Sequence, residues 1–308
     1  MPARRFVRAL YSRASGSRAL GRPLAAIRSR PRVRAFARRH VQVLLGRGTT
    51  WANVDGALRL LAEDRRQRIV FGPWQGDPLL ELLYWAPFVR WAQAHFSLDP
   101  ARITVVSSEG AEHWYAGACG AYLDSEAGLG EGCSDAAVFP PEPVLRLIEQ
   151  YRSGAAAPRP LLKRARHVLL TPPDDASAGG LPEPYVALAL EPSVAFPASQ
   201  ANRDAARELT RSLSASGAVA SLEQGDNLRG RHALLGRAIG LVAAWSGAAL
   251  LGVLSGVPTI ALTSSDGTVC EPDLDLALRV AGELGSSLTF LDAAELGALA
   301  AALGEPPR

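Results

Sequence analysis

The chain has 308 residues, enough for two domains of about 100–150 residues that each bury a core. The first 48 residues hold 13 arginines and no acidic residue, so the rest of the chain, with 20 basic and 30 acidic residues, carries a net charge of −10. Three cysteines without metal-ligand spacing favour a reducing compartment and argue against a structural zinc. The composition predicts a soluble, enzyme-sized protein with a separate basic segment and no structural zinc; we expect no bound metal and no cofactor.

The Arg-rich N-terminal segment, residues 1–50, is open to four interpretations, of which nucleic-acid binding is the least favoured. Apolar residues between the arginines, such as Val7 and Leu10, suit an anionic membrane surface. Gly21, Pro23 and Pro31 would interrupt a long helix, which favours a solvated basic tail. Arginine and serine without acidic residues are also typical of a cleaved transit peptide. The near absence of aromatic residues argues against nucleic-acid binding. We expect a cytoplasmic protein that contacts the inner face of a membrane, if at all, through residues 1–48.

Segments typical of strands and helices alternate after residue 50. Strands are expected at 68–71, 103–107, 136–139 and 167–171, and helices at 78–94, 111–123 and 143–152. An open parallel α/β sheet requires this alternation. A loop at 172–184, rich in Pro, Asp, Ser and Gly, then predicts a domain boundary. Residues 51–175 would form one Rossmann-like domain and residues 183–308 a second one.

The second half repeats the alternation. Strands are expected at 185–190, 218–222, 239–244, 257–262 and 288–291, and helices at 202–214, from near 228, at 248–254, 275–284 and 293–303. Residues 238–265 carry no charge, so a membrane span is the first alternative to weigh. Ser246 can cap a helix start, and Gly256 with Pro258 ends that helix. This punctuation favours a buried strand–helix–strand unit over a membrane anchor.

Ligands of open α/β sheets bind at the carboxyl ends of the strands, so the strand-to-helix turns carry the candidate sites. In the first turn, Gly72 and Gly76 permit a tight backbone, Asp77 can cap the helix, and Pro78 suits its first position. A well-punctuated helix start would by itself explain this pattern.

The second turn places Glu109, Glu112 and His113 beside a strand end. A histidine with carboxylates at a cleft edge can supply a general base. The simpler interpretation is a structural or surface histidine.

In the second half, Trp245, Ser246 and Gly247 precede a helix whose N-terminal N–H groups could bind a diphosphate. Neither a Walker loop nor a dinucleotide fingerprint is present. Asp273 and Asp275 could hydrogen-bond ribose hydroxyls. A role for one of them as a helix N-cap is the simpler interpretation.

Several segments together point to a family. They are GPWQGDPLLELLYWAPFVRW at 72–91, WY at 114–115, Asn202, NLRGRHALLGRA at 227–238, SGVPTIAL at 255–262 and LDLA at 274–277. In this order they resemble bacterial GT-B-type glycosyltransferases of surface-polysaccharide pathways, from about residue 66 onward. The resemblance implies two facing Rossmann-like domains. It also implies an acceptor bound mainly by the first domain, a nucleotide-sugar bound mainly by the second, and no obligatory metal.

The chain departs from the family pattern at three positions. A Ser-Arg-Gly-Gly-like turn is replaced by Ser107–Gly110, which removes a cation, and a Gly-Thr-Tyr-Gly-Gly-like turn is replaced by Ala243–Gly247. Asp273 stands where a histidine is expected. Arg231 and Arg237 are the candidates to replace the missing cation. These departures leave the predicted fold intact and weaken the case for catalysis.

Two functions are therefore expected as alternatives. The first is a metal-independent glycosyltransferase that moves a sugar from a nucleotide-sugar to a glycan or lipid-linked acceptor. Its predicted site comprises His113, Glu109 and Asp77 as catalytic candidates, Trp245, Ser246, Gly247, Arg231, Arg237, Asp273 and Asp275 on the donor side, and Gly72, Trp74, Gly76 and Glu81 on the acceptor side. The second is a catalytically inactive relative that acts as a binding or scaffold protein in a polysaccharide-assembly complex.

Overall fold

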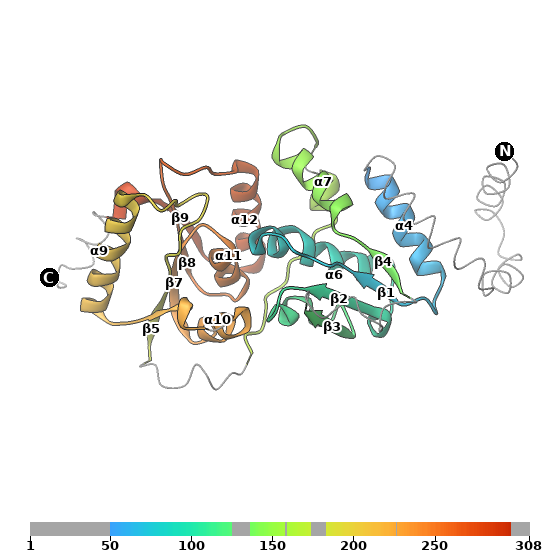
Figure 1. Ribbon diagram of the computed structural model, residues 1–308, viewed down its shortest axis with the longest axis horizontal. Helices are drawn as coiled ribbons and strands as arrows, with labels where there is room; N and C mark the ends of the chain where they lie inside the picture. Colours follow the sequence, from blue (N-terminus) through green and yellow to red (C-terminus); the bar gives the residue numbers. More distant parts are fainter. Residues whose placement is uncertain (1–49, 125–135, 158, 174–182, 226, 297–308) are drawn as a thin grey trace, which may run out of the picture. The chain divides into compact units, whose positions relative to one another are not determined.

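The computed structural model describes residues 50–124, 136–157, 159–173, 183–225 and 227–296. The chain divides after Gln67 into two units. In the first unit, helix α4 (Trp51–Glu63) begins at Thr50, whose side chain accepts a hydrogen bond from the N–H of Asn53. Both sheets belong to the second unit (Figure 1). The Arg-rich segment up to residue 49 lies outside the described residues, as does most of the loop at 172–184, where the predicted domain boundary stays a prediction.

The first sheet contains only parallel strand pairs within the described residues. Its strands are β1 (Ile69–Phe71), β2 (Ile103–Ser107), β3 (Ala121–Asp124) and β4 (Ala137–Phe139), in the order β3-β2-β1-β4. Every residue of β1 and β2 is buried, as expected for a parallel sheet covered on both faces. Helices α7 (Glu142–Arg152) and α8 (Arg159–Leu162) follow β4. The strands predicted at 68–71, 103–107 and 136–139 and the helix at 143–152 are confirmed.

The second sheet is also parallel. Its strands are β5 (Tyr185–Ala189), β6 (Ala218–Ser221), β7 (Ala238–Ala244), β8 (Thr259–Thr263) and β9 (Leu288–Asp292), in the order β6-β5-β7-β8-β9. Its helices are α9 (Gln200–Ser216), α10 (Leu228–Leu235), α11 (Gly247–Leu254) and α12 (Glu271–Leu284). The uncharged stretch forms β7, α11 and β8, which confirms the strand–helix–strand prediction. No helix in the described ranges is long and apolar enough to cross a membrane.

The helical segment after β1 changes its winding along its length. It begins as α5 (Pro78–Leu80), continues as a π-helical segment (Glu81–Trp85) and ends as α6 (Ala86–His95). Pro87 has no N–H, so the carbonyl of Leu83, four residues earlier, lacks its usual helical partner. The Nε2 atom of His167 lies 2.9 Å from that carbonyl oxygen. The side chain of His167 thereby supplies the hydrogen bond that Pro87 cannot donate.

Two predicted elements are wrong. Residues 111–123 are not one helix: a 3₁₀ turn (Glu112–Tyr115) is followed by strand β3. Gly117 has a positive φ of 76° between them, which ends any helix there. Residues 167–171 form no strand, and the N–H of Leu170 donates instead to the carbonyl of Leu254.

Further 3₁₀ turns are Pro100–Arg102, Leu222–Gln224 and Ala293–Glu295. The last of them begins the helix predicted at 293–303, most of which lies outside the described residues.

Each sheet has its own core. Around the first sheet, the rings of Phe71, Trp85, Phe88 and Phe139 pack with centroid distances between 5.4 and 6.5 Å. The core of the second sheet comprises Leu188, Phe196, Leu209, Val242, Ala244, Leu262 and Leu296. Burial of such side chains contributes about 1.5–3 kcal/mol each, so both cores are substantial.

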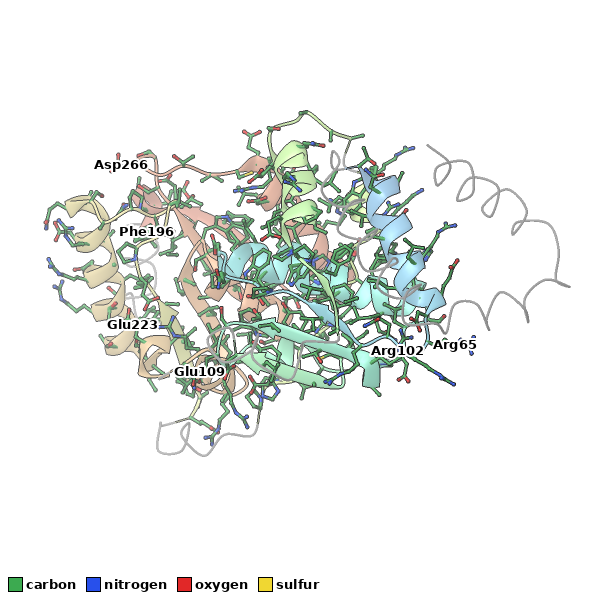
Figure 2. All side chains as sticks on the ribbon, turned by 45° about the vertical axis from the view of Figure 1, so that its right-hand side comes forward. Arg65, Arg102, Glu109, Phe196, Glu223 and Asp266 are labelled. Carbon is green, nitrogen blue, oxygen red and sulfur yellow. The ribbon has the colours of Figure 1, made fainter. Side chains whose placement is uncertain are left out.

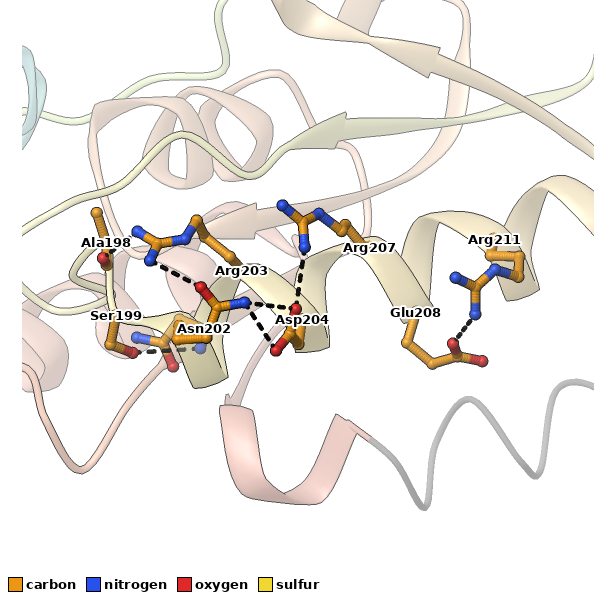
Figure 3. A network of polar contacts seen from close by, with 9 residues as sticks. Ala198, Ser199, Asn202, Arg203, Asp204, Arg207, Glu208 and Arg211 are labelled. Atoms are coloured by element: carbon orange, nitrogen blue, oxygen red, sulfur yellow. Dashed lines mark hydrogen bonds and ion pairs between the residues drawn. The ribbon is translucent and has the colours of Figure 1, made fainter.

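Helix α9 has one side buried against the second sheet and one side exposed to solvent. Asn202 is buried, and its side-chain amide donates to the carbonyl of Pro197 at 2.8 Å. On the exposed side, Arg207 pairs with Asp204, and Arg211 pairs with Glu208 (Figure 3). Exposed pairs of this kind contribute about 0–1 kcal/mol each. We interpret these pairs as part of a solvent-exposed helix face and do not assign a functional site to them.

Candidate functional site

The order of the strands indicates where a ligand would bind. In the first sheet the order reverses between β1 and β4, and in the second between β5 and β7. Ligands of open parallel sheets bind outside the carboxyl ends of the strands at such switch points. The turn after β1, residues 72–77, and the turn after β7, residues 245–246, therefore each border a switch point.

The turn after β1 exposes one carboxylate. Asp77 is the N-cap of α5, and its Oδ1 accepts a hydrogen bond from the N–H of Leu79 at 2.8 Å. Asp77 is exposed, and Pro78 occupies the first position of the helix, as predicted. Because a cap uses only one carboxylate oxygen, the other oxygen of Asp77 remains able to accept a proton or a hydrogen bond.

The other predicted residues of this turn have packing roles. Gly72 has a φ of 122°, and a Cβ there would lie 2.3 Å from the carbonyl oxygen of Val106. Trp74 is buried and stacks on Trp85 with ring centroids 5.9 Å apart. A Cβ at Gly76 would lie 3.0 Å from the Trp74 ring. These residues hold the turn against β2 and against the aromatic core.

The turn after β7 meets the turn after β1. Ser246 caps α11 by accepting from the N–H of Ala248. A Cβ at Gly247 would lie 2.8 Å from Cβ of Pro78 and 3.0 Å from the backbone nitrogen of Leu79. The two helix starts therefore touch, and this contact alone explains a glycine at 247. Ser246 and Ala248 remain partly exposed beside it. Trp245 is buried against Phe290, so its ring belongs to the core.

The two candidate arginines lie at opposite ends of the strands of the second sheet. Arg231 on α10 makes a two-point contact with Glu191, which follows β5, with both N–O distances at 3.2 Å. It thus lies at the carboxyl ends of the strands. Arg237 directly precedes β7 and pairs with Glu183, which precedes β5. It lies at the amino ends, so the structure does not bring it together with Ser246 and Gly247.

The turn after β2 packs on the first turn of α10. Gly110 has a φ of 84°, and a Cβ there would lie 2.7 Å from the backbone nitrogen of Arg229. Glu112 Oε1 lies 3.3 Å from His113 Nε2 and 3.2 Å from Arg229 Nη1. Glu109, labelled in Figure 2, is exposed. His113 therefore has a carboxylate beside it, and His232 of α10 lies across from it with ring centroids 6.3 Å apart.

Glu81 is fully buried in the π-helical segment. Its Oε1 accepts hydrogen bonds from the hydroxyls of Ser107 and of Tyr115, the latter at 2.6 Å. Burial raises the pKa of Glu81 to about 7, an effect that the two hydrogen bonds partly oppose. Because the side chain is closed off from solvent, its direct role lies in the packing beneath the turns.

Asp273 is part of a second buried polar cluster. The hydroxyl of Tyr84 donates to its Oδ1 at 2.6 Å, and Arg152 Nη2 lies 3.1 Å from its Oδ2. Arg152 Nε also donates to Cys270 Sγ at 3.3 Å. The expectation that Asp273 or Asp275 caps α12 is wrong, because Cys270 is the N-cap residue. Asp275, two residues further along the helix, is exposed.

Sequence reasoning missed most partners in these clusters. It did not select Ser107, Tyr115, Tyr84, Arg152, Arg229 or His232. A lone acid within the apolar run LLELLYW was the one signal that marked a buried polar cluster. Among the described residues, no group of three or more His, Cys, Asp or Glu side chains is placed to hold a metal ion.

Comparison with known proteins gives no match. No protein-family model, no curated protein and no solved structure is significantly similar to the chain. The class that the structure itself defines is an α/β protein with two parallel sheets, consistent with a Rossmann-like fold.

Proposed function

We propose that the chain is a glycosyltransferase that moves a sugar from a nucleotide-sugar to a hydroxyl of a glycan or lipid-linked acceptor, without a metal. The observation that carries the proposal is the contact between the turns after β1 and β7, through Gly247 and Pro78. Each turn is adjacent to the switch point of its own sheet. A facing pair of Rossmann-like domains, with the acceptor on the first sheet and the donor on the second, is part of the proposal.

In this proposal, Asp77 is the general base of the reaction. Its carboxylate is exposed, and the next residue in the chain, Pro78, packs against Gly247 at the start of α11. The acceptor hydroxyl gives its proton to Asp77, and its oxygen bonds to the anomeric carbon of the donor. The bond from that carbon to the diphosphate breaks, and its electron pair leaves with the diphosphate. The N–H groups at the start of α11, with Arg231, stabilise the charge of the leaving group.

Replacing Asp77 by Asn tests this assignment. Asparagine caps a helix as well as aspartate does, so we expect an unchanged melting temperature. It cannot take the proton, so we expect kcat to fall about 100-fold. The measurement is nucleotide release from UDP-, GDP-, ADP-, dTDP- and CMP-sugars, with a methyl glycoside as acceptor.

Asp99 provides the matched control. It also precedes a proline and caps a short helix, with Oδ1 accepting from the N–H of Ala101 at 3.0 Å. The Asp99→Asn variant should keep full activity. Equal activity of the Asp77→Asn variant and the unmodified protein would remove Asp77 as the base.

A catalytically inactive scaffold is the second candidate. The observation that favours it is the packing of Pro78 and Leu79 against Gly247, which fills space beside the α11 N-terminus. The two candidates differ in nucleotide binding. A nucleotide at about 100 times its Kd adds about 2.7 kcal/mol of stability. If none of UDP, GDP, ADP, CMP or dTDP raises the melting temperature and no donor is consumed, the scaffold is the better description.

We extend the proposal to the Arg-rich segment. Thirteen arginines without an acidic residue in residues 1–48 would bring the enzyme to anionic lipid and its lipid-linked acceptors. We expect the full chain to sediment with phosphatidylglycerol vesicles and to be released by salt. A chain with these arginines changed to glutamine should stay in the supernatant. Equal sedimentation of the two chains would contradict this role.

A further inference from the structure

Two imidazole rings meet where the turn after β2 packs on α10. The centroids of His113 and His232 are 6.3 Å apart, and the rings are inclined by 71°. His232 has no exposed surface, and neither of its ring nitrogens has a hydrogen-bond partner among the residues that the structure describes. Nε2 of His113 is also buried without a hydrogen bond, although Glu112 lies beside it.

Unpartnered ring nitrogens in a buried position require an explanation. Most buried polar atoms in native proteins have a hydrogen-bond partner, either from protein or from an ordered molecule. Leaving one unpaired is costly, and an apolar side chain would avoid the cost. Because the two rings do not bond to each other, one oxygen atom between them would give both a partner.

The charges around the two histidines indicate which kind of oxygen-containing group would bind between them. Burial, and secondly the nearby His113, lower the pKa of His232 to about 4, so its ring is neutral at pH 7. A neutral ring offers one donor and one acceptor, which matches a hydroxyl group. Glu112 disfavours an anion beside the rings, and because Arg229 already pairs with Glu112 at 3.2 Å, no second cation is needed there.

We propose that His113 and His232 form a binding subsite for one hydroxyl group of an uncharged sugar. The ligand's identity as a sugar rests on the proposed function, whereas the subsite itself rests on the unpartnered rings. His113 lies in the turn after β2, the strand next to β1 in the first sheet. The occupant of the subsite differs from the diphosphate in carrying no charge.

Crystal structures with methyl glucoside, methyl galactoside and methyl mannoside test the subsite. We expect a glycoside oxygen within about 3.2 Å of a nitrogen of each ring, and a water at the same place in the ligand-free crystal. Two results would overturn the proposal. One is no oxygen between the rings in any crystal, and the other is a structural water that none of the glycosides displaces.

Two matched variants measure the contribution of His232 in solution. His232→Phe removes unpartnered nitrogens, so the melting temperature should stay the same or rise by about 2–4 °C. Its Kd for the bound glycoside should rise at least tenfold. His167→Phe is the control: it removes the contact to the carbonyl of Leu83, so it should lower the melting temperature and leave the Kd unchanged.

A third variant keeps the proposal testable if His232→Phe fails to fold. His113 is partly exposed, so His113→Phe should fold, and its Kd should also rise tenfold. An unchanged Kd in either folded variant would overturn the subsite. These readouts are independent of Asp77 and of catalysis. A chain that binds glycosides through the two histidines but consumes no donor would refute the proposed transferase and keep the subsite.

Discussion

The Arg152→Met variant is expected to lose about 3–5 kcal/mol of unfolding free energy, the usual cost of removing one partner of a buried ion pair. Only 2% of the Asp273 side chain is exposed, against 33% of Arg152. Without Arg152, the carboxylate keeps the Tyr84 hydroxyl but has no cation. The measurement is urea unfolding at neutral pH, extrapolated linearly to water.

Replacing Asp273 instead of Arg152 should cost less unfolding free energy. In Asp273→Asn the amide oxygen can still accept from Tyr84, and Arg152 can turn its guanidinium toward water because it is partly exposed. We expect a loss of about 1–3 kcal/mol. The double variant should be more stable than Arg152→Met alone, since it buries no unpaired charge. Arg207→Met removes an exposed ion pair of α9 and should cost no more than about 1 kcal/mol. Equal costs for Arg152→Met and Asp273→Asn would contradict the argument.

Glu81 should make the protein less stable as the pH rises. The folded protein holds the Glu81 proton up to a pKa of about 7, whereas the ordinary value is 4.5. A difference of one pKa unit corresponds to 1.36 kcal/mol. The stabilisation by the protonated carboxyl is therefore complete below pH 4.5, and about 3 kcal/mol of it is lost as the pH rises through 7.

The Glu81→Gln variant isolates this effect. Glutamine keeps an oxygen for Ser107 and Tyr115 and cannot ionise, so the variant should lie within about 1 kcal/mol of the protein at pH 5 and exceed it by about 3 kcal/mol at pH 8. Burial lowers the pKa of His167 and of His232 to about 4, which gives the opposite pH dependence. Both proteins share these histidines, so their effect cancels in the difference.

Glu149 serves as the control for Glu81. It is exposed on α7, and Glu149→Gln should change the unfolding free energy by less than about 0.5 kcal/mol at either pH. Parallel curves of unfolding free energy against pH for the protein and for Glu81→Gln, between pH 5 and pH 8, would show that burial does not raise the pKa of Glu81.

The parts of the fold that the sequence made predictable are those with a strong local signal. The runs IVF and ITVVS are apolar throughout and became the buried strands β1 and β2. Ser246 and Asp77 were recognisable as caps because capping is a local hydrogen bond. Strand β3 was missed because it is a half-exposed edge strand of four residues, preceded by Gly120, so its pattern is short and weak.

The polar clusters depend on contacts that no local pattern records. Asp273 was expected to cap a helix or to bind ribose, but Pro272 at the second helical position sets the start of α12 at Cys270. Its true partners, Tyr84 and Arg152, come from two other helical segments far away in the sequence. Such pairings follow from the packing of the sheets, so the candidate site could be predicted by its turns but not by its buried network.

The π-helical segment Glu81–Trp85 makes the spacing of Glu81 and Tyr84 an unusually strict requirement. Within three residues, one side chain contacts Ser107 and Tyr115 of the first sheet region, while the other contacts Asp273 of α12. A one-residue deletion here would restore ordinary α-helical winding and rotate everything before it by about 100° relative to everything after it. Either contact could then form, but not both. In descendants of this chain, insertions and deletions should therefore be tolerated in the surface loops and purged from this short segment.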